Sequence, residues 1–247
     1  MASILDGKSV VVTGASSGIG AAVVRALAAE GARLTIGARR VDRLERLAEE
    51  IGVDRVTVVK TDMRIEDDVV RLIAAARDRF GGVDVLVNNA GLGRQAPVSS
   101  AATELWREML ETNVLGLLIA TREAIQDMER RGVAGHIVHV SSMAGHRVPG
   151  PDSGVYAATK FAVRAITEGV RQELRARKSP IRVSSVSPGY VDTEFTQVFV
   201  GPGRMPQPRD TRSLDPGDVA RAIVWVLTQP PHMEVHDVLV RPTGQRH

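Results

Sequence analysis

The sequence predicts an α/β protein built on a doubly wound parallel sheet, and two observations carry this prediction. Short runs rich in Val and Ile alternate with longer amphipathic stretches along the 247 residues. The short runs are apolar on both faces, as in strands of a parallel sheet that helices cover from both sides. Right-handed crossovers between such strands give the doubly wound arrangement. No repeat, low-complexity tract or linker divides the chain, so residues 1–247 are expected to form a single domain.

The expected strands and helices alternate along the chain. Strands are expected at Ser9–Thr13, Arg33–Gly37, Val56–Lys60, Val83–Asn88, His136–Ser141, Arg182–Ser187 and His236–Arg241. Helices are expected at Gly18–Glu30, Val41–Ile51, Ile65–Phe80, Thr103–Arg131, Tyr156–Arg177 and Pro216–Thr228. The stretch from Gly201 to Arg212, rich in Pro, Gly and Arg, interrupts this alternation. It is either a surface loop or a mobile lid over a site at the carboxyl ends of the strands.

The composition argues against several classes of function. The absence of cysteine rules out disulfides, thiolate metal sites and thiol catalysis, and no metal site is predicted. No basic region followed by an apolar run opens the chain, and no uncharged apolar stretch reaches the roughly 18 residues of a membrane span. A cytoplasmic protein is therefore expected. Although the pI is about 9.7, charges of both signs alternate and aromatic residues make up only 3%. Nucleic-acid binding is therefore not expected.

A glycine-rich turn follows the first strand and opens the first helix. It reads Thr13-Gly14-Ala15-Ser16-Ser17-Gly18-Ile19-Gly20. Glycines there allow a tight turn and close approach of the backbone to a diphosphate, to which the helix N-terminus offers free N–H groups. The spacing G-x-x-x-G-x-G differs from the usual G-x-G-x-x-G, and a glycine turn without a ligand is the alternative. The position between a strand and a helix favours nucleotide binding.

The end of the second strand bears on the choice between NAD and NADP. Folds that prefer NAD place an acidic residue here to bind the ribose 2′-OH, whereas a nearby Arg accommodates a 2′-phosphate. Ala38 is not acidic, and Arg39 and Arg40 are cationic, which favours NADPH. The alternative is that both arginines are solvated charges at a helix start. Asp62, after the third strand, is expected either to hold the adenine amine or to cap the helix that follows.

Polar residues and glycines also end the later strands. Asn88-Asn89-Ala90-Gly91 ends the fourth strand, Ser141-Ser142 the fifth, and Pro188-Gly189 the sixth, with Thr193 shortly after. In a parallel sheet these segments meet at one edge, where such folds bind ligands. The alternatives are an Asx turn for the asparagines and a helix cap or turn for the serines.

Tyr156 and Lys160 form the most informative pair in the chain. Four residues apart on a helix, the two side chains lie on one face. An ammonium beside a phenol stabilises the phenolate and lowers the phenol's pKa. The pair is therefore a candidate proton donor and acceptor for the interconversion of a carbonyl and an alcohol, although such pairs also occur by chance.

Together these motifs resemble the short-chain dehydrogenase/reductase family over essentially the whole chain. The resemblance rests on the glycine turn, Asn88–Gly91, Asn113, Ser142, Tyr156 with Lys160, and Pro188-Gly189 with Thr193. It implies a sheet of seven strands in the order 3-2-1-4-5-6-7 and a homo-oligomer, a tetramer or a dimer. It implies a catalytic tetrad of Asn113, Ser142, Tyr156 and Lys160. It also implies contacts to NADP(H) from Gly14, Ser16, Ser17, Gly18, Ile19, Gly20, Arg39, Arg40, Asp62, Met63, Asn89, Ala90, Gly91, Tyr156, Lys160, Pro188, Gly189, Val191 and Thr193.

The resemblance gives each member of the tetrad a role in carbonyl reduction. Ser142 and Tyr156 would donate hydrogen bonds to the substrate oxygen, and Tyr156 would then give up its proton as the general acid. Lys160 is expected to hold the ribose hydroxyls and to lower the tyrosine pKa by about three units. Asn113 would position a water that relays protons to Lys160. Ser142 is preferred over Ser141 because the family pattern Ser-x-x-Gly fits Ser142 and Gly145.

The function implied is an NADPH-dependent carbonyl reductase or alcohol dehydrogenase acting on a small or medium ketone or aldehyde. Met143, His146, Gly93, Arg94 and Phe195 are expected to line the substrate pocket, although His146 and Arg147 are equally plausible as surface residues. The branch that the chain resembles contains clavulanate-type aldehyde reductases, small 3-hydroxy acid or amino-acid dehydrogenases, and keto-steroid reductases. The alternatives are an NAD-linked 3-hydroxy acid dehydrogenase, an epimerase or dehydratase, and a non-catalytic NADPH sensor.

Overall fold

The computed structural model describes residues 3–200 and 213–245. Its strands are β1 (Ser9–Thr13), β2 (Arg33–Ala38), β3 (Val56–Lys60), β4 (Val85–Asn88), β5 (His136–Val140), β6 (Arg182–Pro188) and β7 (Asp237–Val240). Its α-helices are α1 (Gly18–Ala29), α2 (Val41–Ile51), α3 (Glu66–Phe80), α4 (Thr103–Leu110), α5 (Gly116–Arg131), α6 (Gly154–Ala176), α7 (Glu194–Val200) and α8 (Pro216–Leu227). A π-helical turn, Glu111–Leu115, joins α4 to α5.

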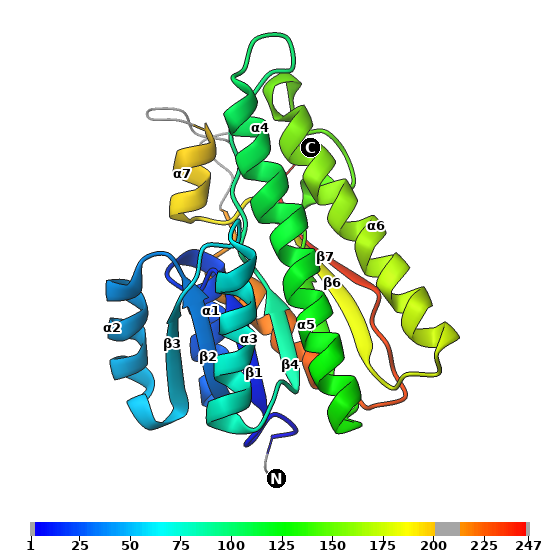
Figure 1. The fold of residues 1–247 in the computed structure, drawn as a ribbon. Coiled ribbons are helices and arrows are strands. Elements are labelled where there is room, and N and C mark those ends of the chain that lie inside the picture. The colour runs from blue at the N-terminus through cyan, green and yellow to red at the C-terminus, as the bar shows by residue number, and fades with distance from the viewer. Residues whose placement is uncertain (1–2, 201–212, 246–247) are drawn as a thin grey trace.

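The strands form one seven-stranded sheet in the order β3-β2-β1-β4-β5-β6-β7 (Figure 1). Every neighbouring pair is parallel. The chain moves outward from β1 to β3 and then returns to the other side of β1 as β4. The order therefore reverses between β1 and β4, which opens a crevice at the carboxyl ends of these strands. The predicted fold class and strand order are confirmed.

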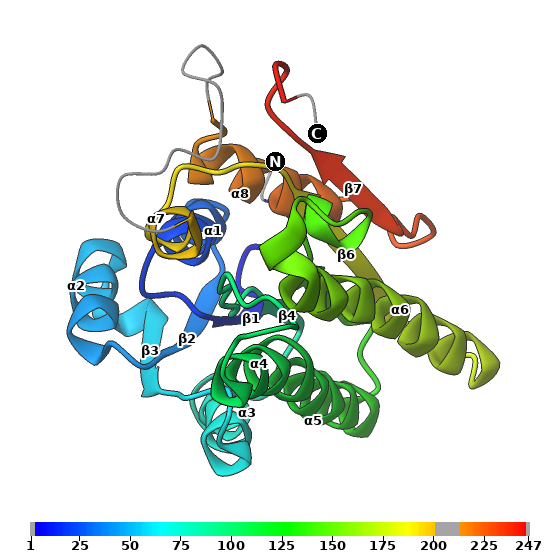
Figure 2. The same cartoon turned by 90° about the horizontal axis from the view of Figure 1, so that it is seen from above.

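Helices cover both faces of the sheet, and each face has its own apolar core (Figure 2). Side chains of α1, α2 and α8 pack with one face of the central strands. Side chains of α3, α5 and α6 pack with the other face. All residues of β1 and β5 are buried, because each strand is covered from both sides. This explains why the strands read as continuous Val- and Ile-rich runs.

Most predicted bounds differ from the observed ones by no more than two residues, and three departures are informative. The helix expected at Thr103–Arg131 is divided by the π-helical turn. Strand β4 begins at Val85 rather than Val83, because the Val83 amide donates instead to Asp127 Oδ2 at 2.8 Å. The helix α7 was not predicted; it directly precedes the stretch 201–212, which lies outside the described residues.

Candidate functional site

A cavity of about 320 Å³ opens at the carboxyl ends of the strands. Its walls come from the turns after β1 to β6, from the first turns of α6 and from α7, with Gln245 after β7. Every residue that the sequence assigns to the cofactor lines this cavity, as do Ser142, Tyr156 and Lys160. Segments from both ends of the chain therefore meet around a single space.

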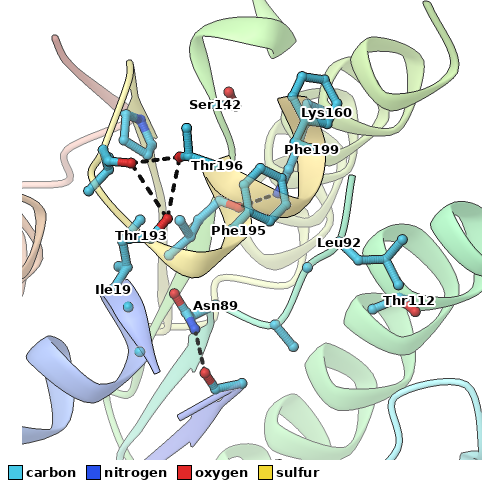
Figure 3. Close-up of a pocket in the computed structure, with 18 of the residues that line it drawn as sticks. Ile19, Asn89, Leu92, Thr112, Ser142, Lys160, Thr193, Phe195, Thr196 and Phe199 are labelled. Carbon is cyan, nitrogen blue, oxygen red and sulfur yellow. Dashed lines mark hydrogen bonds between the residues drawn. The ribbon is translucent and has the colours of Figure 1, made fainter. Parts of the chain in front are cut away.

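The glycine turn after β1 is built by close backbone packing. Gly14 adopts a φ of +67°, and a Cβ there would come within 2.7 Å of the Ala90 Cα. A Cβ on Gly20 would lie 2.3 Å from the Gly14 carbonyl oxygen. Asn89, labelled in Figure 3, holds the turn in place, since its Nδ2 donates to Thr13 O at 3.0 Å and to Gly14 O at 3.2 Å. Larger residues would therefore force the turn open.

The N-terminus of α1 faces the cavity with its positive end uncompensated. Within the described residues no side chain caps it, and its first turn contains no acid. Gly18, Ile19 and Gly20 of this turn line the cavity. Such a turn offers backbone N–H donors and a positive partial charge to an anion. The local structure therefore fits the diphosphate of a dinucleotide.

Arg39 and Arg40, at the end of β2, differ in the contacts that their guanidinium groups make. Arg40 Nη1 donates to Glu194 Oε2 at 2.8 Å, and the same guanidinium reaches the hydroxyls of Ser16 and Ser17. Arg39 is exposed and makes no hydrogen bond or ion pair with any residue the structure describes. Arg39 is thus the uncommitted cation at the end of β2 and can receive a phosphate without breaking a bond.

Asp62 does not cap the helix that follows it. The residue preceding α3 is Ile65, and the carboxylate of Asp62 instead pairs with Arg64, whose Nη2 lies 2.6 Å from Asp62 Oδ2. This pairing holds the pKa of Asp62 below its ordinary value. The helix-capping alternative is therefore wrong, and Asp62 presents a carboxylate to the cavity.

The two serines after β5 have different partners. Ser141 is buried, and its hydroxyl donates to Lys160 O at 3.2 Å, which ties the strand end to α6. Ser142 lines the cavity, and its Oγ accepts from the Ala144 amide at 3.1 Å. The same hydroxyl also hydrogen-bonds Tyr156, so the two candidate donors lie side by side at the cavity. Both serines border the cavity, but the hydroxyl of Ser141 is held by the α6 backbone, whereas that of Ser142 lies next to Tyr156.

Asn113 lies in the π-helical turn and is buried behind the cavity wall rather than in it. Its Nδ2 donates to Leu92 O at 2.8 Å and to Thr159 Oγ1 at 3.0 Å, and its Oδ1 accepts from Leu92 N at 2.8 Å. The side chain therefore locks the segment after β4 to α6. With the side chain committed, the residue can act on a ligand only through its backbone.

Tyr156 is buried beneath the two phenylalanines of α7. Its ring centroid lies 5.0 Å from that of Phe199 and 5.7 Å from that of Phe195. Figure 3 shows both phenylalanines projecting from α7 into the cavity. Burial raises the pKa of Tyr156 to about 12, and a hydrogen bond with Ser142 opposes this rise. The lowering expected from Lys160 is not found: burial is the largest cause of the shift, and Lys160 is not among its causes.

Lys160 is buried beside Tyr156, and its Nζ donates to Val140 O at 3.0 Å. Burial lowers the pKa of Lys160 to about 8. Beneath it, His139 lies between Thr121 Oγ1 at 3.1 Å and Thr167 Oγ1 at 2.9 Å. Burial, helped by the charge of Lys160, lowers the pKa of His139 to about 3. His139 is therefore a neutral structural residue that joins β5 to α5 and α6.

The expected substrate residues divide into two groups. Met143 and Phe195 line the cavity, whereas Gly93, Arg94 and His146 do not. Gly93 lies behind α7, where a Cβ would meet Phe199 at 2.6 Å.

The side chains of Arg94 and His146 are directed to acids outside the cavity wall. Arg94 Nη2 lies 4.0 Å from Glu108 Oε2, and His146 Nε2 lies 3.2 Å from Asp237 Oδ2. Sequence reasoning did not assign Phe199 or Gln245 to the cavity, although both line it. No local motif marks either residue: Phe199 lies on the helix α7, which was not predicted, and Gln245 lies beyond the last strand.

Two negative findings concern the part of the chain that the structure describes. It contains no cluster of three His, Asp or Glu side chains arranged to hold a metal ion. None of its helices combines the length and the apolar character of a membrane-spanning segment.

Comparison with known proteins identifies the family. A sequence model described as short chain dehydrogenase matches residues 8–200. The chain is 44% identical to "Dehydrogenase/reductase SDR family member 11" of Bos taurus, covering 95% of this chain and 96% of the relative. It is 42% identical to "Farnesol dehydrogenase" of Aedes aegypti, covering 97% and 98% of the two chains. A solved structure described as the closed form of serine dehydrogenase complexed with NADP+ superposes with a TM-score of 0.89 at 33% identity, covering 96% of each chain. The chain belongs to the short-chain dehydrogenase family.

Proposed function

We propose that this protein is an NADPH-dependent oxidoreductase that interconverts a carbonyl and an alcohol. One observation carries the proposal: Ser142, Tyr156 and Lys160 line the same cavity as the glycine turn and Arg39. A hydride carrier and a proton donor can thus meet one substrate within a single space. The residues proposed to bind the cofactor and those proposed to transfer the proton follow strands of one sheet. We therefore expect residues 1–247 to act as one domain.

The residues at the ends of β1 and β2 would hold the cofactor. The backbone of the glycine turn and the N-terminus of α1 would bind the diphosphate. Arg39 would bind the 2′-phosphate, because it is the uncommitted cation of the pair at the end of β2. The serine dehydrogenase structure that contains NADP+ has the same fold at 33% identity, which supports this preference. When bound, the reduced cofactor supplies the hydride.

Tyr156 would protonate the substrate oxygen during reduction. With its pKa raised to about 12, the phenol is fully protonated at neutral pH and can donate to the carbonyl. An alkoxide is a stronger base than a phenolate, so the proton moves from Tyr156 once negative charge develops on that oxygen. Ser142 would share the hydrogen bonding to this oxygen, and the ammonium of Lys160 would stabilise the resulting phenolate.

We also propose that the protein self-associates through α5 and α6. Leu115 and Leu118 are 50% and 39% exposed and Phe161 is 42% exposed, although all three are large apolar residues. Leu117 and Val163, by contrast, are buried within the chain itself. The molar mass in solution tests the association.

The function is tested by following NADPH oxidation with a panel of aldehydes, ketones and 3-oxo acids. We expect turnover of at least one class, and a higher kcat/KM with NADPH than with NADH. Tight NADPH binding without turnover of any compound would contradict the proposal and favour a sensor. Binding of NADPH is measured separately by fluorescence, so that loss of the cofactor site and loss of chemistry are distinguished.

A further inference from the structure

Arg147 places an unpartnered positive charge at the cavity. It lies in the segment that joins β5 to α6, after Ser142 and before Tyr156. Its side chain lines the cavity, and its Nη2 is buried without a hydrogen-bond partner among the residues that the structure describes. A guanidinium stays charged at physiological pH, so burying one of its N–H groups without a partner is costly unless an anion meets it.

The other cations of the cavity wall already have partners or face the nucleotide. Lys160 donates to Val140 O, and Arg40 pairs with Glu194. Arg39 follows β2, which lies on the other side of β1 from β5. Because Arg147 arises from the β5 side, the diphosphate and the 2′-phosphate sites are not its neighbours in the topology.

Among the described residues that line the cavity, no acid pairs with Arg147. Among the lining residues that the structure describes, Asp62 is the only acid, and it follows β3 and pairs with Arg64. The lining near Tyr156 is instead largely apolar and includes Met143, Ala144, Phe195 and Phe199. A charged donor in an apolar wall is the arrangement that gives orientation and specificity to a small-molecule site.

The backbone that carries Arg147 is held firmly. Arg164 Nη1 donates to Gly145 O at 3.0 Å, and Arg164 Nε lies 3.3 Å from Asp237 Oδ2. The Arg147 amide donates to Met143 O at 3.3 Å. These contacts tie the segment to α6 and β7 and so fix the backbone from which the Arg147 side chain reaches the cavity.

We infer that the substrate carries a carboxylate in addition to its carbonyl or hydroxyl group, and that Arg147 binds this carboxylate. The inference rests on the proposed function, because it assigns the substrate class of the same site. A carboxylate matches the planar fork of one guanidinium and brings a single charge. A phosphate monoester would bring a charge of about −1.5 to −2, which one cation among apolar side chains cannot balance. An oxo acid with an apolar body fits both the single charge of Arg147 and the apolar lining of the cavity.

The test compares a 3-oxo acid with the methyl ester of the same acid, using the full-length protein and NADPH. We expect the wild-type protein to prefer the acid. Arg147→Met should lower kcat/KM for the acid by roughly ten- to a hundredfold, the range expected for a lost charge-assisted hydrogen bond. The ester should be reduced by this variant nearly as well as by the wild-type protein. Arg221→Met is the matched control, because Arg221 is exposed on α8 and pairs with Asp218.

The possible outcomes separate this inference from the proposed function. If the wild-type protein reduces neither compound nor any other carbonyl, the proposed function fails. If it reduces the ester and Arg147→Met leaves the ratio of acid to ester unchanged, only the inference is overturned. If Arg147→Met loses both activities, Arg147→Lys decides: a lowered ratio of acid to ester supports the inference and an unchanged ratio overturns it.

Discussion

The two ends of the cavity are built by different means. The nucleotide end, after β1 and β2, is shaped by backbone: Gly14 and Gly20 pack against neighbouring main chain, and its cations Arg39 and Arg40 are exposed. The carbonyl end, after β5, is shaped by side chains that are almost completely removed from water, with Tyr156 at 7% and Lys160 at 5% exposure.

This difference gives the two ends different physical properties. An exposed guanidinium keeps its ordinary charge and binds a phosphate at modest cost, in competition with solvent and salt. A buried phenol and ammonium have shifted pKa values, upward to about 12 for Tyr156 and downward to about 8 for Lys160. Loss of one exposed arginine at the nucleotide end is therefore expected to cost less activity than loss of a buried group at the carbonyl end.

The largest effect is expected at the carbonyl end. Tyr156→Phe should lower kcat by roughly a hundred- to ten-thousandfold, because the general acid is lost while the ring and its packing against α7 remain. The dissociation constant of NADPH should change little. Steady-state kinetics and a fluorescence titration measure the two quantities. Tyr190→Phe, at the other tyrosine of the cavity wall, controls for the loss of a hydroxyl and should cost far less. Substantial residual turnover in Tyr156→Phe would rule out this residue as the acid.

A smaller effect is expected at the nucleotide end. Arg39→Ala should raise KM for NADPH by roughly tenfold to a hundredfold and leave KM for NADH almost unchanged, because only the phosphorylated cofactor loses a charge-assisted contact. Parallel kinetics with the two cofactors measure the difference. Arg46→Ala removes an exposed arginine of α2 that pairs with Asp42 and is the matched control. An equal rise for both cofactors would remove Arg39 from the 2′-phosphate site.

The smallest effect is expected in stability beneath the carbonyl end. The pKa of His139 falls from its ordinary 6.5 to about 3 on folding. Below pH 6.5 His139 is protonated in the unfolded chain but stays neutral in the folded protein. Its contribution to the free energy of unfolding is therefore fully present above pH 6.5 and is lost as the pH falls toward 3. The slope from this group is at most about 1.4 kcal/mol per pH unit.

His139→Gln keeps a donor and an acceptor between Thr121 and Thr167. It should make the free energy of unfolding fall less steeply as the pH is lowered. Urea unfolding between pH 7 and about pH 4 measures the free energy of unfolding. The comparison concerns slopes, since the variant also changes packing. His232→Gln, at an exposed histidine, should leave the slope unchanged. An identical slope in His139→Gln and the wild-type protein would mean that His139 titrates normally.

The same contrast explains how far the sequence alone could lead. The fully buried strand β1, the edge strand β3 and the amphipathic helix α2 all leave local patterns, and their bounds are those that the sequence predicts. The helix α7 was missed because seven residues flanked by Thr193 and a Pro- and Gly-rich stretch carry no clear period. The raised pKa of Tyr156 was missed because burial under Phe195 and Phe199 depends on that same helix.

Side-chain direction in the loops was the other limit. Arg94, His146 and Arg147 stand in irregular segments, where no period fixes which way a side chain points. Arg94 and His146 are drawn to acids on other elements, Glu108 and Asp237. Arg147 lacks such an acid among the described residues and remains at the cavity. The direction of the Arg147 side chain therefore depends on where charges distant in sequence lie, which no local pattern reveals.

The π-helical turn Glu111–Leu115 also determines which faces of α4 and α5 point toward the protein interior. One extra residue in a turn rotates all later side chains by about 100° relative to an unbroken α-helix. Before the turn, Leu105 and Met109 pack in the apolar cluster around Tyr156. After it, Ala124 and Met128 pack against the sheet. A stretch whose sequence predicts one continuous helix is thus two helices whose buried faces are rotated relative to each other. Asn113 lies in the turn where this rotation occurs.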